Sequence, residues 1–150
     1  MRRSLLSLPV LLILTATSQA QESRWIADAH TGCRMWSLTP APNESIAWEG
    51  ACVGGYGQGH GVLKWFLGGA LYETDEGNFT GGKLNGHATI AFIDGERFDG
   101  EFRGHLPNGR GTLRTSANEV FSGLWSDGCF DDGKRRMSFG VKPTQCVFAS

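Results

Sequence analysis

Beyond its first twenty residues the sequence contains no long apolar run. Glycine and charged residues interrupt the chain too often for any stretch to reach the roughly 20 apolar residues that cross a bilayer. The first twenty residues differ: Met1-Arg2-Arg3 is basic, Leu5 to Leu14 is apolar, and Ser18-Gln19-Ala20 offers a small-residue cleavage site. This order is typical of a secretory signal peptide. We therefore expect residues 1–20 to be removed after Ala20, and an exported (periplasmic or secreted) mature chain with no transmembrane span.

The sequence also lacks an excess of basic residues. Without Arg2 and Arg3, 12 basic side chains stand against 15 acidic ones, which leaves a formal charge of −3. Nucleic-acid-binding domains carry a basic stripe or patch, so we expect no nucleic-acid partner. The local run Lys134-Arg135-Arg136 is typical of a solvated edge, and lipid contact there is only a minor alternative.

Motifs for cofactors and catalysis are missing as well. No Gly-x-Ser-x-Gly occurs, and Gly77 to Lys83 fits Gly-x-x-x-x-Gly-Lys only until Leu84, which stands where a Mg²⁺-binding Ser or Thr belongs. Acidic residues gather in Glu73-Thr74-Asp75-Glu76 and at Asp127, Asp131 and Asp132, where we expect solvated turns and linkers. These absences predict a protein without a nucleotide cofactor and without catalytic activity.

What the sequence does contain is a repeat. Taking Gly50 as an anchor, glycines follow 9 and 11 residues later, an apolar residue at 13 and an aromatic residue at 15. Further anchors follow at intervals of 27, 23 and 23 residues, within the range of repeat proteins. The fourth unit keeps its beginning but has Asp132, Lys134, Arg136 and Ser138 at the later offsets. The glycines that define the repeat are Gly50, Gly59, Gly61, Gly77, Gly86, Gly100, Gly109, Gly111 and Gly123.

Each unit has the pattern of a β-hairpin with one apolar face. Phe98, Gly100 and Phe102 alternate along one limb and Ala88, Ile90 and Phe92 along another, which is the period of two that a strand requires. Between the limbs lie short segments rich in Gly, Asn, Asp and Lys, which is turn chemistry. Glycine in mid-strand is destabilising by roughly 0.5–1 kcal/mol. Its recurrence predicts that aromatic rings cover the bare backbone.

The units resemble the MORN (membrane occupation and recognition nexus) repeat, whose pattern is aromatic-x-Gly-x-aromatic, then Gly, then Gly-x-Gly and an apolar strand. Phe98-Asp99-Gly100-Glu101-Phe102 through Gly109-Arg110-Gly111-Thr112-Leu113 is the closest match. The resemblance covers about residues 47–138 and implies an all-β fold, an elongated, twisted antiparallel sheet of consecutive hairpins. It implies scaffolding or binding rather than a particular chemistry.

The repeat geometry bears on the histidines and on the cysteines. His60 and His87 take equivalent positions in consecutive units, so we expect them about 9.5 Å apart and solvent-facing. That separation is too long for a shared zinc ion, and we predict no metal site. An even number of cysteines in an exported small domain predicts two disulfides. Three connectivities are possible, but the ends of an extended array lie far apart, which favours Cys33–Cys52 and Cys129–Cys146.

Both ends of the array look covered. Residues 21–46 form an N-terminal cap segment in which 33–38 is an extra strand. If Cys33 lies opposite Cys52 in an antiparallel pair, Trp36 falls opposite Glu49. At the other end the polar fourth unit caps the array, and residues 139–150 are a tail tied down by Cys146.

The sequence therefore predicts a non-catalytic, exported repeat module that binds an unidentified protein or cell-envelope component. Its aromatic side chains are expected to fill the core and to line the concave side of the twisted sheet. We name Trp65, Phe92 and Arg110 as candidate binding residues, with Trp65 and Phe92 forming a row across the sheet. The alternatives are a small secreted carbohydrate hydrolase that uses groove carboxylates, and a purely structural spacer.

Overall fold

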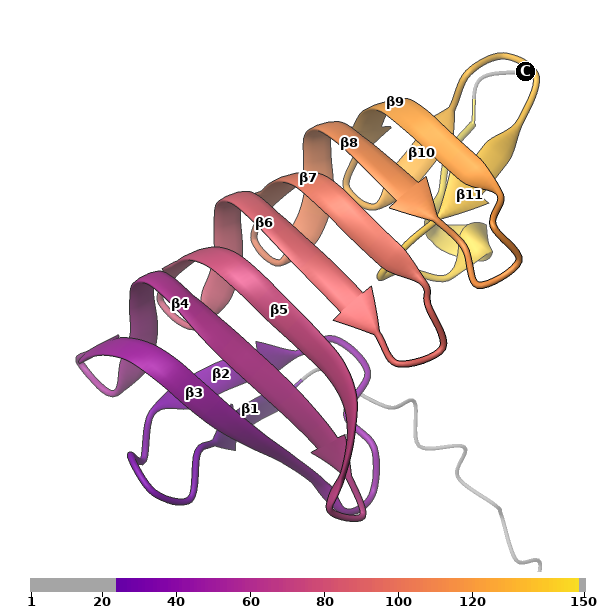
Figure 1. The fold of residues 1–150 in the computed structure, drawn as a ribbon. Helices are drawn as coiled ribbons and strands as arrows, with labels where there is room; N and C mark the ends of the chain where they lie inside the picture. The colour runs from indigo at the N-terminus through magenta and orange to yellow at the C-terminus, as the bar shows by residue number, and fades with distance from the viewer. Residues whose placement is uncertain (1–23, 149–150) are drawn as a thin grey trace, which may run out of the picture.

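The computed structural model describes residues 24–148, which form a nearly all-β chain (Figure 1). The predicted signal peptide, residues 1–20, lies outside this range. No helix among the described residues has the length and apolar character needed to span a membrane. The elements are β1 Arg24–Ala27, β2 Arg34–Ser37, β3 Glu44–Val53, β4 Tyr56–Leu67, β5 Ala70–Thr80, β6 Lys83–Phe92, β7 Arg97–Arg103, β8 Leu106–Arg114, β9 Val120–Ser126, β10 Cys129–Asp131, β11 Arg136–Ser138 and the 3-10 helix η1 Pro143–Gln145.

Consecutive strands pair antiparallel from β3 through β11, so the predicted row of hairpins is confirmed (Figure 1). Four hairpins turn at the same repeat offsets. Both turn residues have positive φ, which short hairpin turns require and which explains the glycines there. The turns are Gly54–Gly55, Gly81–Gly82, Gly104–His105 and Asp127–Gly128.

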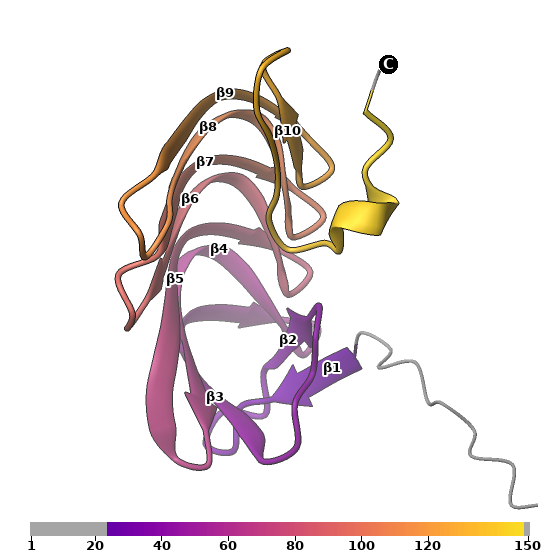
Figure 2. The same ribbon diagram turned by 90° about the vertical axis from the view of Figure 1, so that its right-hand side faces the viewer.

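A recurring irregularity bends the strands. In three hairpins the register shifts by two residues immediately beside the anchor, between Glu49 and Ala51, between Gly77 and Phe79, and between Gly100 and Phe102. Extra residues in one strand of a pair bend that strand and increase its twist. Since the shift recurs at the same place, the bends add up, and the sheet curls into an arch (Figure 2).

The core lies inside this arch. Aromatic rings cover several of the mid-strand glycines, as the sequence predicted, but the anchor Gly77 packs against Ala88 instead. An added Cβ at Gly111 would meet the ring of Phe98, and one at Gly61 would meet the ring of Trp48. Ring contacts continue along the array, from Trp48 against Phe79 to Trp125 against Phe130. A single curled sheet thus buries its aromatic residues without a covering helix.

The N-terminal segment closes one end of the arch. Strands β1 and β2 form a hairpin that packs across the concave side, and its Met35 covers Gly57 (Figure 2). The expected register, with Trp36 opposite Glu49, is wrong. β2 pairs with β1, and it bridges β4 only through Arg34 and Tyr56. The reason is packing: lying beneath the sheet buries Cys33 and Met35 completely, whereas an edge strand would leave them half exposed.

The C-terminal segment closes the other end. β10 and β11 continue the sheet as a short cap, and the chain then folds back into the arch instead of leaving it as a tail (Figure 2). Phe139 is buried and stacks on Phe98 at a centroid distance of 5.3 Å. Its backbone N–H donates to the carbonyl oxygen of Gly128 at 2.8 Å.

Both predicted disulfides are present, Cys33–Cys52 and Cys129–Cys146. Among the described residues no cysteine is free. The first disulfide joins the N-terminal hairpin to β3, and the second joins the returning C-terminal segment to β10. Disulfides of this kind persist in oxidising compartments, so the protein belongs to such an environment.

Candidate functional site

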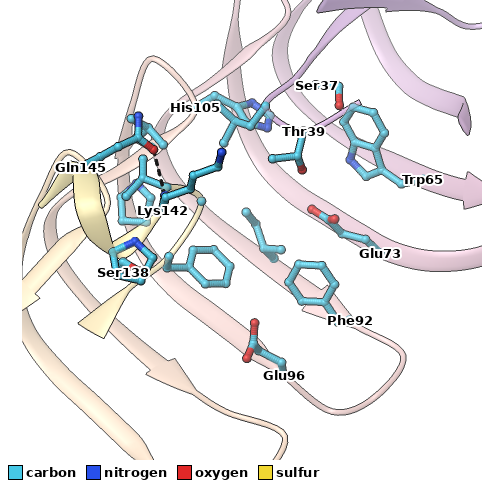
Figure 3. A pocket seen from close by; sticks show the side chains of 18 of the residues that line it. Ser37, Thr39, Trp65, Glu73, Phe92, Glu96, His105, Ser138, Lys142 and Gln145 are labelled. Carbon is cyan, nitrogen blue, oxygen red and sulfur yellow. Dashed lines mark hydrogen bonds between the residues drawn. The ribbon is translucent and has the colours of Figure 1, made fainter. Parts of the chain in front are cut away.

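The concave side of the arch contains an open groove of about 1060 Å³ (Figure 3). One wall is the inner face of the sheet, and the other comes from the segments that begin at the ends of β2 and β11. These two segments meet there, since an added Cβ at Gly140 would lie 3.2 Å from Cδ1 of Leu38. The sheet contributes Trp65, Tyr72, Glu73, Ile90 and Phe92, and the β6–β7 turn contributes Glu96. The β7–β8 hairpin contributes His105 to Pro107, and the two segments of the second wall contribute Ser37 to Thr39, Ser138 to Pro143 and Gln145.

Trp65, Glu73 and Phe92 form a row across the floor of the groove. Trp65 pairs with Glu73 in the register of β4 and β5, and Glu73 pairs with Phe92 in that of β5 and β6. The expected row of Trp65 and Phe92 is therefore present, with a carboxyl group between the rings (Figure 3). Phe92 is partly buried, whereas Trp65 is only 3% exposed and offers little accessible surface.

The acidic residues of β5 do not lie in a solvated turn, and that expectation is wrong. Asp75 is completely buried in mid-strand, where its Oδ2 accepts a hydrogen bond of 2.9 Å from Nε1 of Trp65. Its other oxygen, Oδ1, is buried without a hydrogen-bond partner. Glu73, two residues earlier on the same face, lies beside Asp75 and lines the groove. The other acidic positions are exposed as expected: Glu76, Asp127, Asp131 and Asp132.

Burial changes the protonation of this pair. It raises the pKa of Glu73 well above the usual range, and the neighbouring charge of Asp75 raises it further. Burial also raises the pKa of Asp75, although the hydrogen bond from Trp65 opposes the shift. Asp75 is completely buried and Glu73 is half-buried, and two adjoining carboxylates so poorly solvated repel one another. The pair therefore holds a proton at a pH where free carboxyl groups are ionised.

A third acidic side chain stands next to the pair. Oε1 of Glu44 on β3 accepts a hydrogen bond of 2.7 Å from the hydroxyl of Tyr72, while Oε2 is buried without a partner. Burial raises the pKa of Tyr72, and the hydrogen bond to Glu44 adds to the shift. Glu96, at the other side of Phe92, also lines the groove, and burial raises the pKa of its carboxyl group. This end of the groove is thus acidic and aromatic.

The opposite end contains His105, which the sequence did not single out. It occupies the turn position where the other three hairpins have glycine, with φ of +77°. Its Nδ1 accepts a hydrogen bond of 3.2 Å from the backbone N–H of Leu84. Burial and the nearby charge of Lys83 lower the pKa of His105 to about 4, so its ring is neutral at physiological pH. The sequence did contain a signal for this residue, because a histidine stands at the second turn position where the other three hairpins have glycine.

Arg110 lies on the other face of the sheet. It is exposed on the convex side and borders a shallow hollow of about 330 Å³ together with His87, Asp99 and Glu101. His60 and His87 are exposed there, as expected. The structure therefore brings Trp65 and Phe92 to one groove and does not bring Arg110 to it.

The sequence matches no protein-family model, and a comparison with curated proteins finds no match. The function is therefore inferred from the residues of the groove and from the geometry of the repeat.

Proposed function

We propose that this chain is an exported MORN-repeat module, non-catalytic, that binds a protein or a cell-envelope component through its concave groove. The groove itself carries the proposal. It is open, it is lined by partly buried rings and by carboxyl groups, and the segments around Leu38 and Gly140 form its second wall. Concave sites with apolar lining and few polar groups are the usual places of ligand binding.

Export supports the same proposal. Both disulfides require an oxidising environment, and the first twenty residues have the order of a signal peptide. The repeats resemble MORN units along residues 47–138, and arrays of that kind serve as binding surfaces. The partner is therefore expected outside the cytoplasm.

Affinity capture from the envelope of the exporting cell, followed by mass spectrometry, tests this function. The bait is the disulfide-bonded protein, compared with Phe92→Ala in the groove and with Arg110→Ala on the convex face. A partner retained by wild type and by Arg110→Ala, but reduced at least about tenfold by Phe92→Ala, supports the groove. Equal capture by all three proteins, or a loss confined to Arg110→Ala, would contradict it.

A second candidate function is hydrolysis of a carbohydrate, because Glu73 is a groove carboxyl group that retains its proton. A general acid of this kind is found in glycosidases. The position of the carboxyl groups argues against an enzyme. In glycosidases the two catalytic carboxyl groups lie on either side of the glycosidic bond, about 5 Å or more apart. Glu73 and Asp75 instead lie next to each other on one strand. Turnover of a glycan panel that falls about 10²–10⁴-fold in Glu73→Gln would establish the enzyme instead.

A further inference from the structure

The acidic end of the groove contains more negative charge than its surroundings neutralise. Glu44 and Asp75 lie close enough to Glu73 for their charges to raise its pKa, and among residues 24–148 none of the three forms an ion pair with a basic side chain. Two of their oxygens, Oε2 of Glu44 and Oδ1 of Asp75, are buried and unpartnered. Buried polar atoms without partners are rare in folded proteins, and each one needs a reason.

A metal ion does not supply that reason. Within the described part of the chain, no three His, Cys, Asp or Glu side chains are grouped closely enough to hold one. The basic side chain of the groove is Lys142, which is exposed on the wall opposite Glu73 (Figure 3). It forms no ion pair with a described residue.

The surroundings of Glu73 favour an organic cation. Its carboxyl group lies between Trp65 and Phe92 in the row across the groove, and Tyr72 precedes it on β5 (Figure 3). Phe92 and Tyr72 are partly buried, so part of each ring faces the groove. Aromatic rings attract cations and also pack against alkyl chains. An ammonium group carries three donors, which suits carboxyl oxygens that come from several directions.

We propose that the Glu73 end of the groove is a recognition site for a primary ammonium group on an alkyl chain, as in a lysine side chain of a partner. The alkyl chain lies against Phe92 and Tyr72, and the ammonium group meets Glu73. Asp75 and Glu44 stand behind Glu73 and add negative charge. This inference rests on the proposed binding function and specifies the chemistry that the groove selects.

Binding is coupled to protonation in this arrangement. The free pair holds a proton, which an ammonium group replaces, so affinity increases from pH ~5 to ~8. His105 stays neutral over this range, and lysine side chains stay charged. The titratable and charged groups that face the site or border it are Glu44 on β3, Tyr72, Glu73 and Asp75 on β5, Asp94 and Glu96 at the β6–β7 turn, His105 and Lys142.

The experiment is an NMR titration of the intact, disulfide-bonded protein. The probes are Nα-acetyl-lysine methylamide, whose side-chain ammonium group is free, the corresponding norleucine and arginine derivatives, and 1,5-diaminopentane as a free amine. The indole N–H of Trp65 is the reporter, because it donates to Asp75. Glu73→Gln removes the charge, and Glu76→Gln is the matched control, since Glu76 lies on the same strand and is exposed. Circular dichroism checks that both variants are folded.

The lysine derivative is expected to bind at least about tenfold more tightly than norleucine, and Glu73→Gln to abolish that difference while Glu76→Gln keeps it. Binding of the diamine as well supports ammonium recognition, and binding of the diamine without the lysine derivative assigns the site to small free amines. Equal binding of norleucine or arginine would overturn the proposal. Binding in the groove without a preference for charge would contradict ammonium recognition but not the proposed binding function. Capture of a partner that does not change in Phe92→Ala would contradict the binding function itself.

Discussion

The indole Nε1 of Trp65 donates a hydrogen bond of 2.9 Å to Oδ2 of Asp75, and both side chains are buried inside the curled sheet. Asp75 occupies the repeat position that holds an aromatic residue in the other three units. The donor to it is an aromatic residue of the preceding hairpin. The buried carboxyl group of Asp75 is thus held by a hydrogen bond from an aromatic residue of the neighbouring repeat unit.

The first prediction tests this hydrogen bond. Trp65→Phe is expected to destabilise the fold by about 2–4 kcal/mol, because it leaves Asp75 unpartnered and removes packed ring atoms. Adding Asp75→Leu should recover part of that loss, since replacing both partners by apolar groups removes the unsatisfied oxygen. Chemical denaturation of the two single variants and the double variant measures the coupling. Strictly additive losses would show that the bond contributes no specific stability.

The second prediction concerns pH. Unfolded carboxyl groups release their protons near pH ~4, whereas burial raises the pKa of Glu73 and lifts that of Asp75 to about 6. The folded state therefore holds more protons between these values. Stability from the pair is complete below about pH 4 and is lost as pH rises through about 6 and above, by at most about 1.4 kcal/mol per pH unit for each proton.

Urea denaturation between pH ~4.5 and ~8 measures this slope. Glu73→Gln should flatten it, and Glu76→Gln, on the exposed face of the same strand, should leave it unchanged. An unaltered slope in Glu73→Gln would mean that other groups cause the dependence.

Asp28 has the opposite effect on the pH dependence of stability. Burial favours its protonation, but the backbone N–H groups of Trp48, Thr31 and His30 outweigh it and lower the pKa, so its contribution is lost only as pH falls below about 4.

The third prediction concerns the mid-strand glycines. An added Cβ at Gly100 would lie 2.5 Å from Cα of Gly111 and 3.0 Å from the ring of Phe98. Gly100→Ala should therefore cost about 2 kcal/mol or more, because backbone atoms cannot move aside easily. The control is Gly68→Asn: nothing lies within 4 Å of its Cβ position, and asparagine tolerates a φ of +58°. Losses of equal size, measured by thermal or chemical denaturation, would contradict the role of close packing.

The fourth prediction concerns His105. His105→Gly should change stability by less than about 1 kcal/mol, because relief of the positive φ offsets the lost hydrogen bond to Leu84. His105→Ala keeps the unfavourable φ and loses the bond, so it should be clearly less stable than His105→Gly. If the two variants unfold at the same denaturant concentration, the backbone at this turn is not strained.

The fifth prediction concerns the returning C-terminal segment. Non-reducing peptide mapping should recover Cys33–Cys52 and Cys129–Cys146. Replacing Cys129 and Cys146 together by alanine should cost about 3 kcal/mol, since the unfolded chain regains the freedom of a loop of 17 residues. Hydrogen exchange at the Phe139 amide should accelerate more than at amides of β5. Uniform acceleration throughout the sheet would show that the segment does not open separately.

The sequence by itself determined the local architecture. Alternation of period two, turn residues at fixed offsets and four cysteines near the ends of the array were enough to predict the hairpins, their order and both disulfides. Each of these depends on residues close in sequence or on the repeat. The sequence also predicted that aromatic rings cover the backbone at Gly61 and Gly111, because close packing explains a glycine that recurs in mid-strand at a fixed interval.

Only the tertiary structure decided where the groove lies and what lines it. The arch results from register shifts that accumulate over several hairpins, and the second wall results from Leu38 and Gly140 meeting across it. Both depend on contacts between residues distant in sequence, which no local pattern specifies. Asp75 shows the difference most clearly. An acidic residue in a polar run is typical of a solvated turn, yet in the repeat it occupies a core position, and the curled sheet buries it completely.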